Sequence, residues 1–484
     1  GDRPQFNQSV YNTYGLRNDG TIDGNAVVQP RVGFNYTFDS ERPTQVRGGF
    51  GLFQGSTPGV WLSNSFQNNG LNFFEISLRN QGGFTGDPDH PLCPAPCNPS
   101  TGRQVVDILS PDFQQPTVWK GNLAFDHELP WWGLVASAEV LFTEVESAIY
   151  YEHLNMGPAR GVLPDGRYHY WRDTNANTFT NPTTRAQITN LGSVQRFGAN
   201  PAFGDVVLLD NTTKGSGRQA VVSLEKPIED HWYAKVAYTY TEATEVQTGT
   251  SSQAETNFRT NPIFNINEEV AGKAAYAIKD RFSAYLSYKN DFFGDLDTTF
   301  GMFFESRSGL PFSYTFAGDA NGDGRSTNND LFYVPTGPGD VVFTDVGTGS
   351  SAISAAQQEA AFWAYVESND YLNSRRGQVV ERFGANMPWV NQVDVHIAQE
   401  LPGFFGDNKS EIFLDIVNFG NLLNKDWGMV EEVGFPGFMQ VARMAGVDAN
   451  GRYIYQFTRV PTMRTRDEVG QSRWSVQVGF RYEF

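Results

Sequence analysis

The most specific chemical motif in the sequence is the run D-A-N-G-D-G-R, which begins at Asp319. Oxygen-bearing side chains stand at positions 1, 3, 5 and 12 of this run (Asp319, Asn321, Asp323 and Asp330), with glycine at position 6, as in a calcium-binding loop. Arg325 would add its backbone carbonyl. The departure is Asp330, where such loops carry glutamate. We predict a calcium site here, and the alternative is a plain turn cluster in an acidic loop.

A second group of interest is a set of aromatic side chains that follows Phe142 in a long segment without periodicity. Large aromatic faces can stack on a ligand or a glycan, and they can equally pack a loop against its neighbours. Both interpretations stay open. The residues are Tyr150, Tyr151, Tyr168, Tyr170 and Trp171.

The two cysteines, Cys93 and Cys97, lie in C-P-A-P-C, which is close enough for a small loop-closing disulfide in an oxidising compartment. A zinc half-site is the alternative, but no second cysteine pair or spaced histidine pair completes it.

No pattern in the sequence indicates a catalytic centre. There is no serine elbow, phosphate-binding glycine loop or H-E-x-x-H motif, so we predict that the chain is not an enzyme. The net charge of -18 argues against a nucleic-acid partner, because phosphate binding needs a basic surface.

The elements that must position these residues are β-strands. The last eleven residues, 474–484, alternate strictly between apolar and polar side chains, which predicts a strand with one apolar face. Its length and its aromatic ends are typical of a strand that crosses a bilayer inside a barrel. The 38 Phe, 20 Tyr, 10 Trp and 49 Gly suit strands and turns better than helices.

Similar alternating segments recur along the chain, joined in turn by short polar turns and by long polar loops. The pattern predicts strands around residues 32–38, 46–52, 119–126, 136–142, 220–224, 232–240, 282–288, 298–304, 393–397, 412–416 and 474–484. It also predicts a helix within 352–367 and a hairpin turn at 448–451. Short turns on one side and long loops on the other are typical of outer-membrane barrels, with about eleven strands in this chain.

The fold class that we predict is therefore all-β, a transmembrane antiparallel β-barrel with long extracellular loops. An odd number of strands cannot close a bacterial barrel that has both ends inside. About eleven strands are half of the 22 found in plugged transporters, so the chain would supply the second half of such a barrel. The polar residues expected to line the passage are Arg31, Asn35, Lys120, Asp126, Glu139 and Lys235.

Four stretches carry a family resemblance: V-Q-P-R-V-G-F-N-Y at 28–36, R-G-G-F-G-L-F-Q-G-S-T-P-G-V-W-L-S-N at 47–64, E-S-R-S-G-L-P-F-S-Y at 305–314 and D-I-V-N-F-G-N-L-L-N-K-D-W-G at 415–428. Together with the closing strand, they resemble the TonB-dependent outer-membrane receptors, and within them the Oar-like group. The resemblance covers essentially all of 1–484, as the C-terminal part of the barrel.

This resemblance implies a receptor in the bacterial outer membrane that binds a substrate at extracellular loops and imports it with TonB-coupled energy. Members of the family carry an N-terminal plug domain, which is not found in this chain, so an N-terminal half with the plug becomes an expected partner. The other expected partners are membrane lipid, the TonB-type complex and the barrel assembly machinery. The closing strand resembles the assembly signal of such barrels at Trp474, Phe480, Tyr482 and Phe484. A structural or adhesive surface protein and a secreted calcium-stabilised glycan-binding protein remain alternatives.

Overall fold

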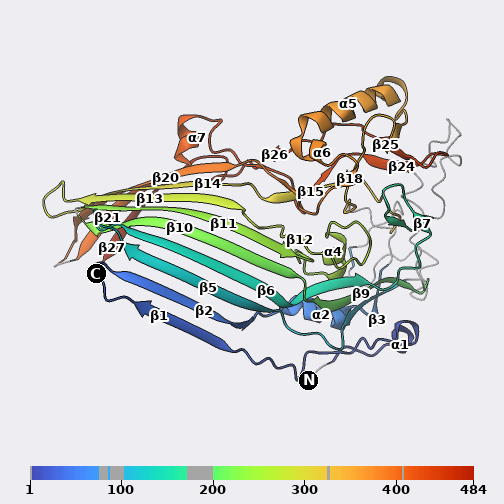
Figure 1. The fold of residues 1–484 in the computed structure, drawn as a ribbon, viewed down its shortest axis with the longest axis horizontal. Coiled ribbons are helices and arrows are strands. Elements are labelled where there is room, and N and C mark those ends of the chain that lie inside the picture. Colours follow the sequence, from blue (N-terminus) through green and yellow to red (C-terminus); the bar gives the residue numbers. More distant parts are fainter. Residues whose placement is uncertain are drawn as a thin grey trace.

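A single long antiparallel sheet organises the chain. The computed structural model describes residues 3–75, 86–87, 103–171, 200–229, 231–323, 328–405 and 408–484. Eleven strands follow one another across the sheet in chain order, each hydrogen-bonded to the next (Figure 1). They are β1 (Arg31–Thr37), β2 (Thr44–Gln54), β5 (Thr117–Glu128), β6 (Val135–His153), β10 (Gly215–Glu229), β11 (Trp232–Glu245), β13 (Asp280–Asn290), β14 (Thr298–Arg307), β20 (Val390–Pro402), β21 (Lys409–Val417) and β27 (Ser475–Glu483).

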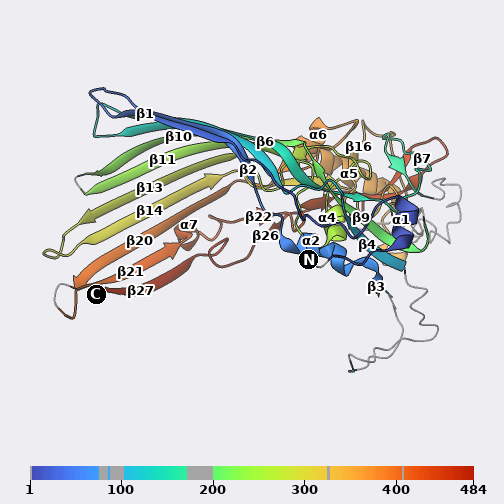
Figure 2. The ribbon, with the colours of Figure 1, turned by 90° about the horizontal axis from the view of Figure 1, so that it is seen from below.

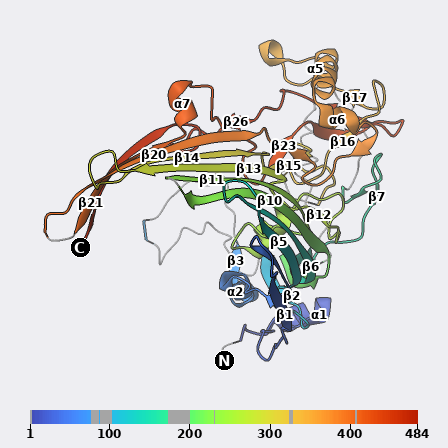
Figure 3. The ribbon, with the colours of Figure 1, turned by 60° about the vertical axis from the view of Figure 1, so that its left-hand side comes forward.

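These eleven strands confirm the prediction from alternation. Each predicted segment lies on one of them, because the side-chain period of two matches a sheet whose two faces meet different surroundings. The sheet curves along its length (Figure 3). Among the described residues β1 pairs only with β2, and β27 pairs only with β21, so the two edges are not joined to each other.

The two ends of the sheet differ sharply. Short turns join the strands at one end, near the C-terminus, and long segments join them at the other (Figures 1 and 2). The segments at the long end are folded, with two helices and three strands that the sequence analysis assigned to loops. These are α1 (Gln8–Tyr14), α2 (Gly59–Gln67), β3 (Asn69–Glu75), β4 (Arg103–Leu109) and β9 (Phe203–Thr212).

The strand β9 pairs with β4 and with the far end of β6, so the sheet continues beyond the regular strands. The long segments that follow β14 and β21 fold together into a large group of small elements, which we call the loop cluster. They are β15 (Pro311–Thr315), β16 (Tyr333–Val334), β17 (Val342–Phe343), α5 (Ala355–Ser368), α6 (Asp370–Ser374), β18 (Gln378–Val379), β19 (Ala385–Asn386), β23 (Phe438–Gln440), β24 (Arg443–Val447) and β25 (Tyr453–Gln456). The remaining short elements are β7 (Gly161–Val162), β8 (Tyr168–His169), α4 (Ala254–Arg259), β12 (Gly272–Lys273), η4 (Gly349–Ser351), α7 (Phe419–Leu423), β22 (Glu431–Glu432) and β26 (Arg464–Thr465).

Two local predictions are confirmed in this cluster. The helix α5 occupies the predicted segment, and Ser354 begins it with a capping box to Gln357. Asp448 accepts the backbone N–H of Gly451 through its carbonyl at 3.0 Å, which closes the turn between β24 and β25. The main apolar core of the chain lies in this cluster and not in the sheet, around Phe316, Phe332 and Phe362.

Candidate functional site

One face of the long sheet is apolar and exposed. Large hydrophobic side chains cover it from the first strand to the last, and most of them are between 40% and 70% exposed. Representative members are Phe34, Phe50, Phe125, Phe142, Val222, Val236, Phe282, Phe300, Ile412 and Phe480. Water does not stabilise an exposed apolar surface of this extent, whereas a lipid environment does. None of the described helices is both apolar enough and long enough to pass through a membrane.

The opposite face carries charged side chains in pairs. Arg47 donates to Asp126 at 2.7 Å and lies 3.9 Å from Glu139, across three neighbouring strands. The register explains this cluster, because Arg47 lies opposite Ala124, and Ala124 lies opposite Glu139, on the same face. Asn122 also donates to Glu139 at 2.9 Å.

Charge pairs continue along this polar face towards the last strand. Lys235 lies 2.8 Å from Glu225, and Arg281 lies 2.6 Å from Glu305. Further pairs are Lys409–Glu400 and Arg481–Glu411, and His396 Nδ1 lies within hydrogen-bond distance of Asp415, at 2.5 Å. All six residues predicted to line the passage lie on this face by register: Arg31, Asn35, Lys120, Asp126, Glu139 and Lys235. Such a face can carry water and polar solutes past an apolar exterior.

The predicted assembly residues lie at the free edge of the sheet. Phe480 points from β27 to the apolar face, and Trp474 and Phe484 flank the strand at its two ends. The ring of Tyr482 stacks on Phe404 at 5.4 Å, and its hydroxyl accepts a hydrogen bond from Asn408 at 3.0 Å. These positions are compatible with an assembly signal, which stays a prediction.

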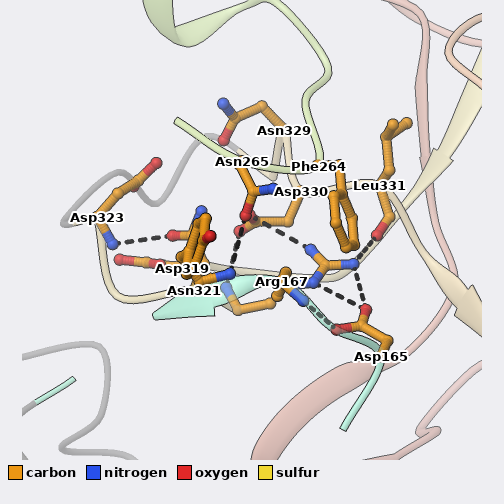
Figure 4. A network of polar contacts seen from close by, with 12 residues as sticks. Asp165, Arg167, Phe264, Asn265, Asp319, Asn321, Asp323, Asn329, Asp330 and Leu331 are labelled. Atoms are coloured by element: carbon orange, nitrogen blue, oxygen red, sulfur yellow. Dashed lines mark hydrogen bonds and ion pairs between the residues drawn. The ribbon is translucent and has the colours of Figure 1, made fainter. Parts of the chain in front are cut away.

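A buried charged cluster joins three of the long segments (Figure 4). The Arg167 guanidinium donates to Asp165 at 2.8 Å and to the carbonyl of Leu331, and it lies 3.5 Å from Asp330. All three charged side chains are at most 1% exposed. Tyr453 of β25 donates to Asp165 at 2.7 Å. Burial disfavours the charge on Arg167, but the neighbouring carboxylates hold its pKa above the ordinary value.

The predicted calcium ligands lie beside this cluster, and their side-chain oxygens accept hydrogen bonds from nearby backbone N–H groups. Asp319 accepts the N–H of Gly322 at 2.6 Å, and Asn321 accepts the N–H of Asp323 at 2.9 Å. Asp330 turns instead towards Arg167 and accepts the N–H of Ala320 at 2.8 Å. Burial raises the pKa of Asp330, and Arg167 offsets part of that rise.

Calcium therefore stays a prediction. Within the described ranges, no group of three or more His, Cys, Asp or Glu residues is placed to hold one metal ion. Arg325 lies outside the described residues, as do Cys93 and Cys97 with their predicted disulfide.

The predicted aromatic platform is mostly interior. Tyr150, Tyr151, Tyr170 and Trp171 are each no more than 8% exposed, and only Tyr168 is on the surface. Trp171 belongs to the main core and donates its indole N–H to the carbonyl of Ala320 at 2.9 Å. Four of these five side chains therefore present no open face to a ligand, and loop packing is the interpretation that fits them.

The sequence analysis missed a cavity of about 260 Å³ where the polar face meets the loop cluster. Its walls combine aromatic and charged side chains, among them Tyr276, Arg307, Phe383, Phe435 and Glu432. These residues come from several segments spread between Tyr276 and Phe435, so no local motif marks them. A mixed wall of this kind suits a small polar ligand.

The comparison with protein-family models agrees with this geometry. The family model described as "Outer membrane beta barrel domain" matches residues 4–426. The outer membrane transporter YddB from Escherichia coli is similar in structure, with a TM-score of 0.39 and 8% identity over 91% of this chain. The chain covers 38% of that transporter. No curated protein matches. The match over most of the chain, together with the apolar exterior, shows that this chain belongs to the outer membrane beta barrel domain family and lies in the outer membrane.

Proposed function

We propose that the chain is the C-terminal part of the barrel of a TonB-dependent receptor of the Oar-like group. The whole receptor binds a substrate at its extracellular loops and imports it through a plugged barrel with TonB-coupled energy. The chain takes part in transport and carries out no reaction of its own. The observation that carries the proposal is the run of eleven consecutive strands, whose two edges are not joined to each other within the described residues and whose long segments are folded at one end.

The free edges supply the physical argument. Each unpaired backbone group at a sheet edge in lipid costs several kcal/mol, so β1 and β27 need partners in the membrane. About eleven further strands would close a barrel of the size found in plugged transporters. We propose that an N-terminal half of the receptor, as part of the same polypeptide or as a separate one, supplies these strands and the plug.

In this proposal the polar face of the sheet and the long segments have different roles. The charged pairs from Arg47 to Arg481 would line the lumen, and the loop cluster with its aromatic core would capture the substrate. The barrel assembly machinery would recognise the closing strand, where Phe480 and Phe484 are exposed. The secreted alternative does not fit a chain of an outer-membrane family.

The test uses protein extracted in detergent from its native membrane. The protein is run on a gel with and without heating, and its intact mass is then measured. We expect a heat-modifiable species that is larger than this chain. The periplasmic domain of the energy-coupling protein, immobilised on a column, should retain it. A heat-modifiable species of the mass of this chain alone, with no retention, would contradict the proposal and favour an adhesive surface protein.

A further inference from the structure

A cavity of about 580 Å³ lies on the loop side of the sheet, apart from the cavity at the mouth of the passage. It is formed where the segment 262–273 meets the segment 379–382, beside the end of β11. Its size is within the range of small-molecule pockets. The lining residues that matter to its chemistry are Phe264, Glu268, Gly272, Lys273, Glu381 and Arg382.

Arg382 is the unusual member of this wall. Its side chain is buried, at 8% exposure, and its Nη1 donates to the carbonyl of Val246 and to Asn261 Oδ1. The Nε and Nη2 atoms have no hydrogen-bond partner. Among the described residues, Glu245 and Glu268 are near enough to favour the charge of the guanidinium, but neither forms a direct ion pair with it. A buried guanidinium normally has its donors satisfied by carboxylates or carbonyls, because unpaired charged donors are costly.

The backbone around Arg382 leaves room for the guanidinium in this position. A Cβ on Gly272 would lie 2.7 Å from Arg382 Nε and 3.0 Å from its Cβ, so any larger residue would displace the side chain. Gly272 is held in place because β12 pairs with β11. The glycine and the strand pairing therefore fix the arginine against the cavity wall.

The other charged side chains that line the cavity have hydrogen-bond or ion-pair partners of their own. Glu381 is paired with Arg375 at 2.5 Å, and Glu268 accepts the backbone N–H of Phe264 at 2.5 Å. Lys273 is exposed, and its Nζ donates to a backbone carbonyl at 3.3 Å. Burial lowers the pKa of Arg382 to about 10, which still leaves the guanidinium charged at neutral pH.

We propose that this cavity binds an anionic group, a carboxylate or a phosphate, of the ligand that the loops capture. The fork of Arg382 would pair with the anion, which is the geometry that guanidinium offers to planar or tetrahedral oxyanions. Lys273 would add a second positive charge at the cavity wall. The inference deepens the proposed function, on which it rests for the role of the ligand, by naming the chemical class of the substrate.

The experiment is a calorimetric titration of the detergent-purified protein with inorganic phosphate and, separately, with acetate, at matched ionic strength in chloride. We expect saturable binding of at least one of them. Arg382→Gln should weaken it about tenfold or more, because a charge-assisted hydrogen bond is lost. Gly272→Ala should weaken it as well. Glu268→Gln should strengthen it by removing a nearby negative charge, and Arg459→Gln, on an exposed arginine outside the cavity, should leave it unchanged.

The outcomes separate the possibilities. Binding of phosphate alone would indicate a phosphorylated ligand, and binding of acetate alone would indicate a carboxylate. No saturable binding, or equal affinity in the wild type and in a folded Arg382→Gln variant, would overturn the inference. Heat-modifiability of each variant on a gel reports its folding. Since the titration needs neither plug nor coupling protein, its failure is distinguishable from failure of the transport proposal.

Discussion

Replacing Arg167 with methionine should open the loop cluster while leaving the long sheet intact. The guanidinium is fully buried between Asp165 and Asp330 and also bonds the carbonyl of Leu331. Methionine keeps much of the volume but leaves two buried carboxylates without a cation. Breaking a buried charged pair by removing one partner costs about 3–5 kcal/mol. The loss should lower the local opening free energy of the cluster by that amount.

Hydrogen exchange measured by mass spectrometry is the suitable assay, because it reports local opening in a protein whose sheet stays folded in detergent. Peptides that cover Tyr453 and Leu331 should exchange roughly 100-fold faster or more in the variant. Peptides from β13 and β14 should not change. The matched control is Arg459→Met, at an exposed arginine six positions after Tyr453 in the sequence.

Removing the whole charged set should restore most of the protection. With Asp165→Asn and Asp330→Asn added to Arg167→Met, no unpaired charge remains, and such replacements of buried ion pairs are often close to neutral. If the single variant changes protection by less than about 1 kcal/mol, or if the triple variant is as unstable as the single one, the pairing does not hold the cluster together.

Three further predictions follow from other parts of the molecule. Burial raises the pKa of Asp107 to about 7, so the folded state holds a proton that the unfolded state has already lost above about pH 4. The region around β4 should therefore lose up to about 4 kcal/mol of stability as the pH rises from about 4 to 7. Asp107→Asn should remove this pH dependence of the local stability, measured by hydrogen exchange. Val222→Arg, on the apolar face, should cost about 2–4 kcal/mol of unfolding free energy in refolding titrations in lipid, while Val221→Arg, its neighbour on the polar face, should be tolerated. Equal effects of the two substitutions would contradict our assignment of the faces. Calcium should protect the turn at Asp319 and Asp323 from exchange, and chelation should remove that protection; an unchanged turn would favour the plain turn cluster.

The sequence determined the framework of this protein. Period-two alternation is local information, and in a sheet with one lipid-facing and one polar face it specifies both the strands and their orientation. The positions of Phe34 and Lys235 on opposite faces were therefore predictable. Short turns and long loops likewise indicated the two ends of the sheet, and the Ala, Gln and Glu content of 352–367 predicted the helix that Ser354 caps.

Only the tertiary structure decided how the long segments fold and what their polar residues do. Burial there depends on contacts between segments far apart in the chain, so the sequence left open whether Tyr151 and Trp171 form a platform or pack the loops, and the structure places both in cores. Asp330 fits a calcium pattern by spacing, yet it faces Arg167, which is 163 positions away. Arg382 carries no local signal at all, because its exceptional property is a pair of buried donor atoms without a hydrogen-bond partner, and the path of the whole chain determines which groups come near them.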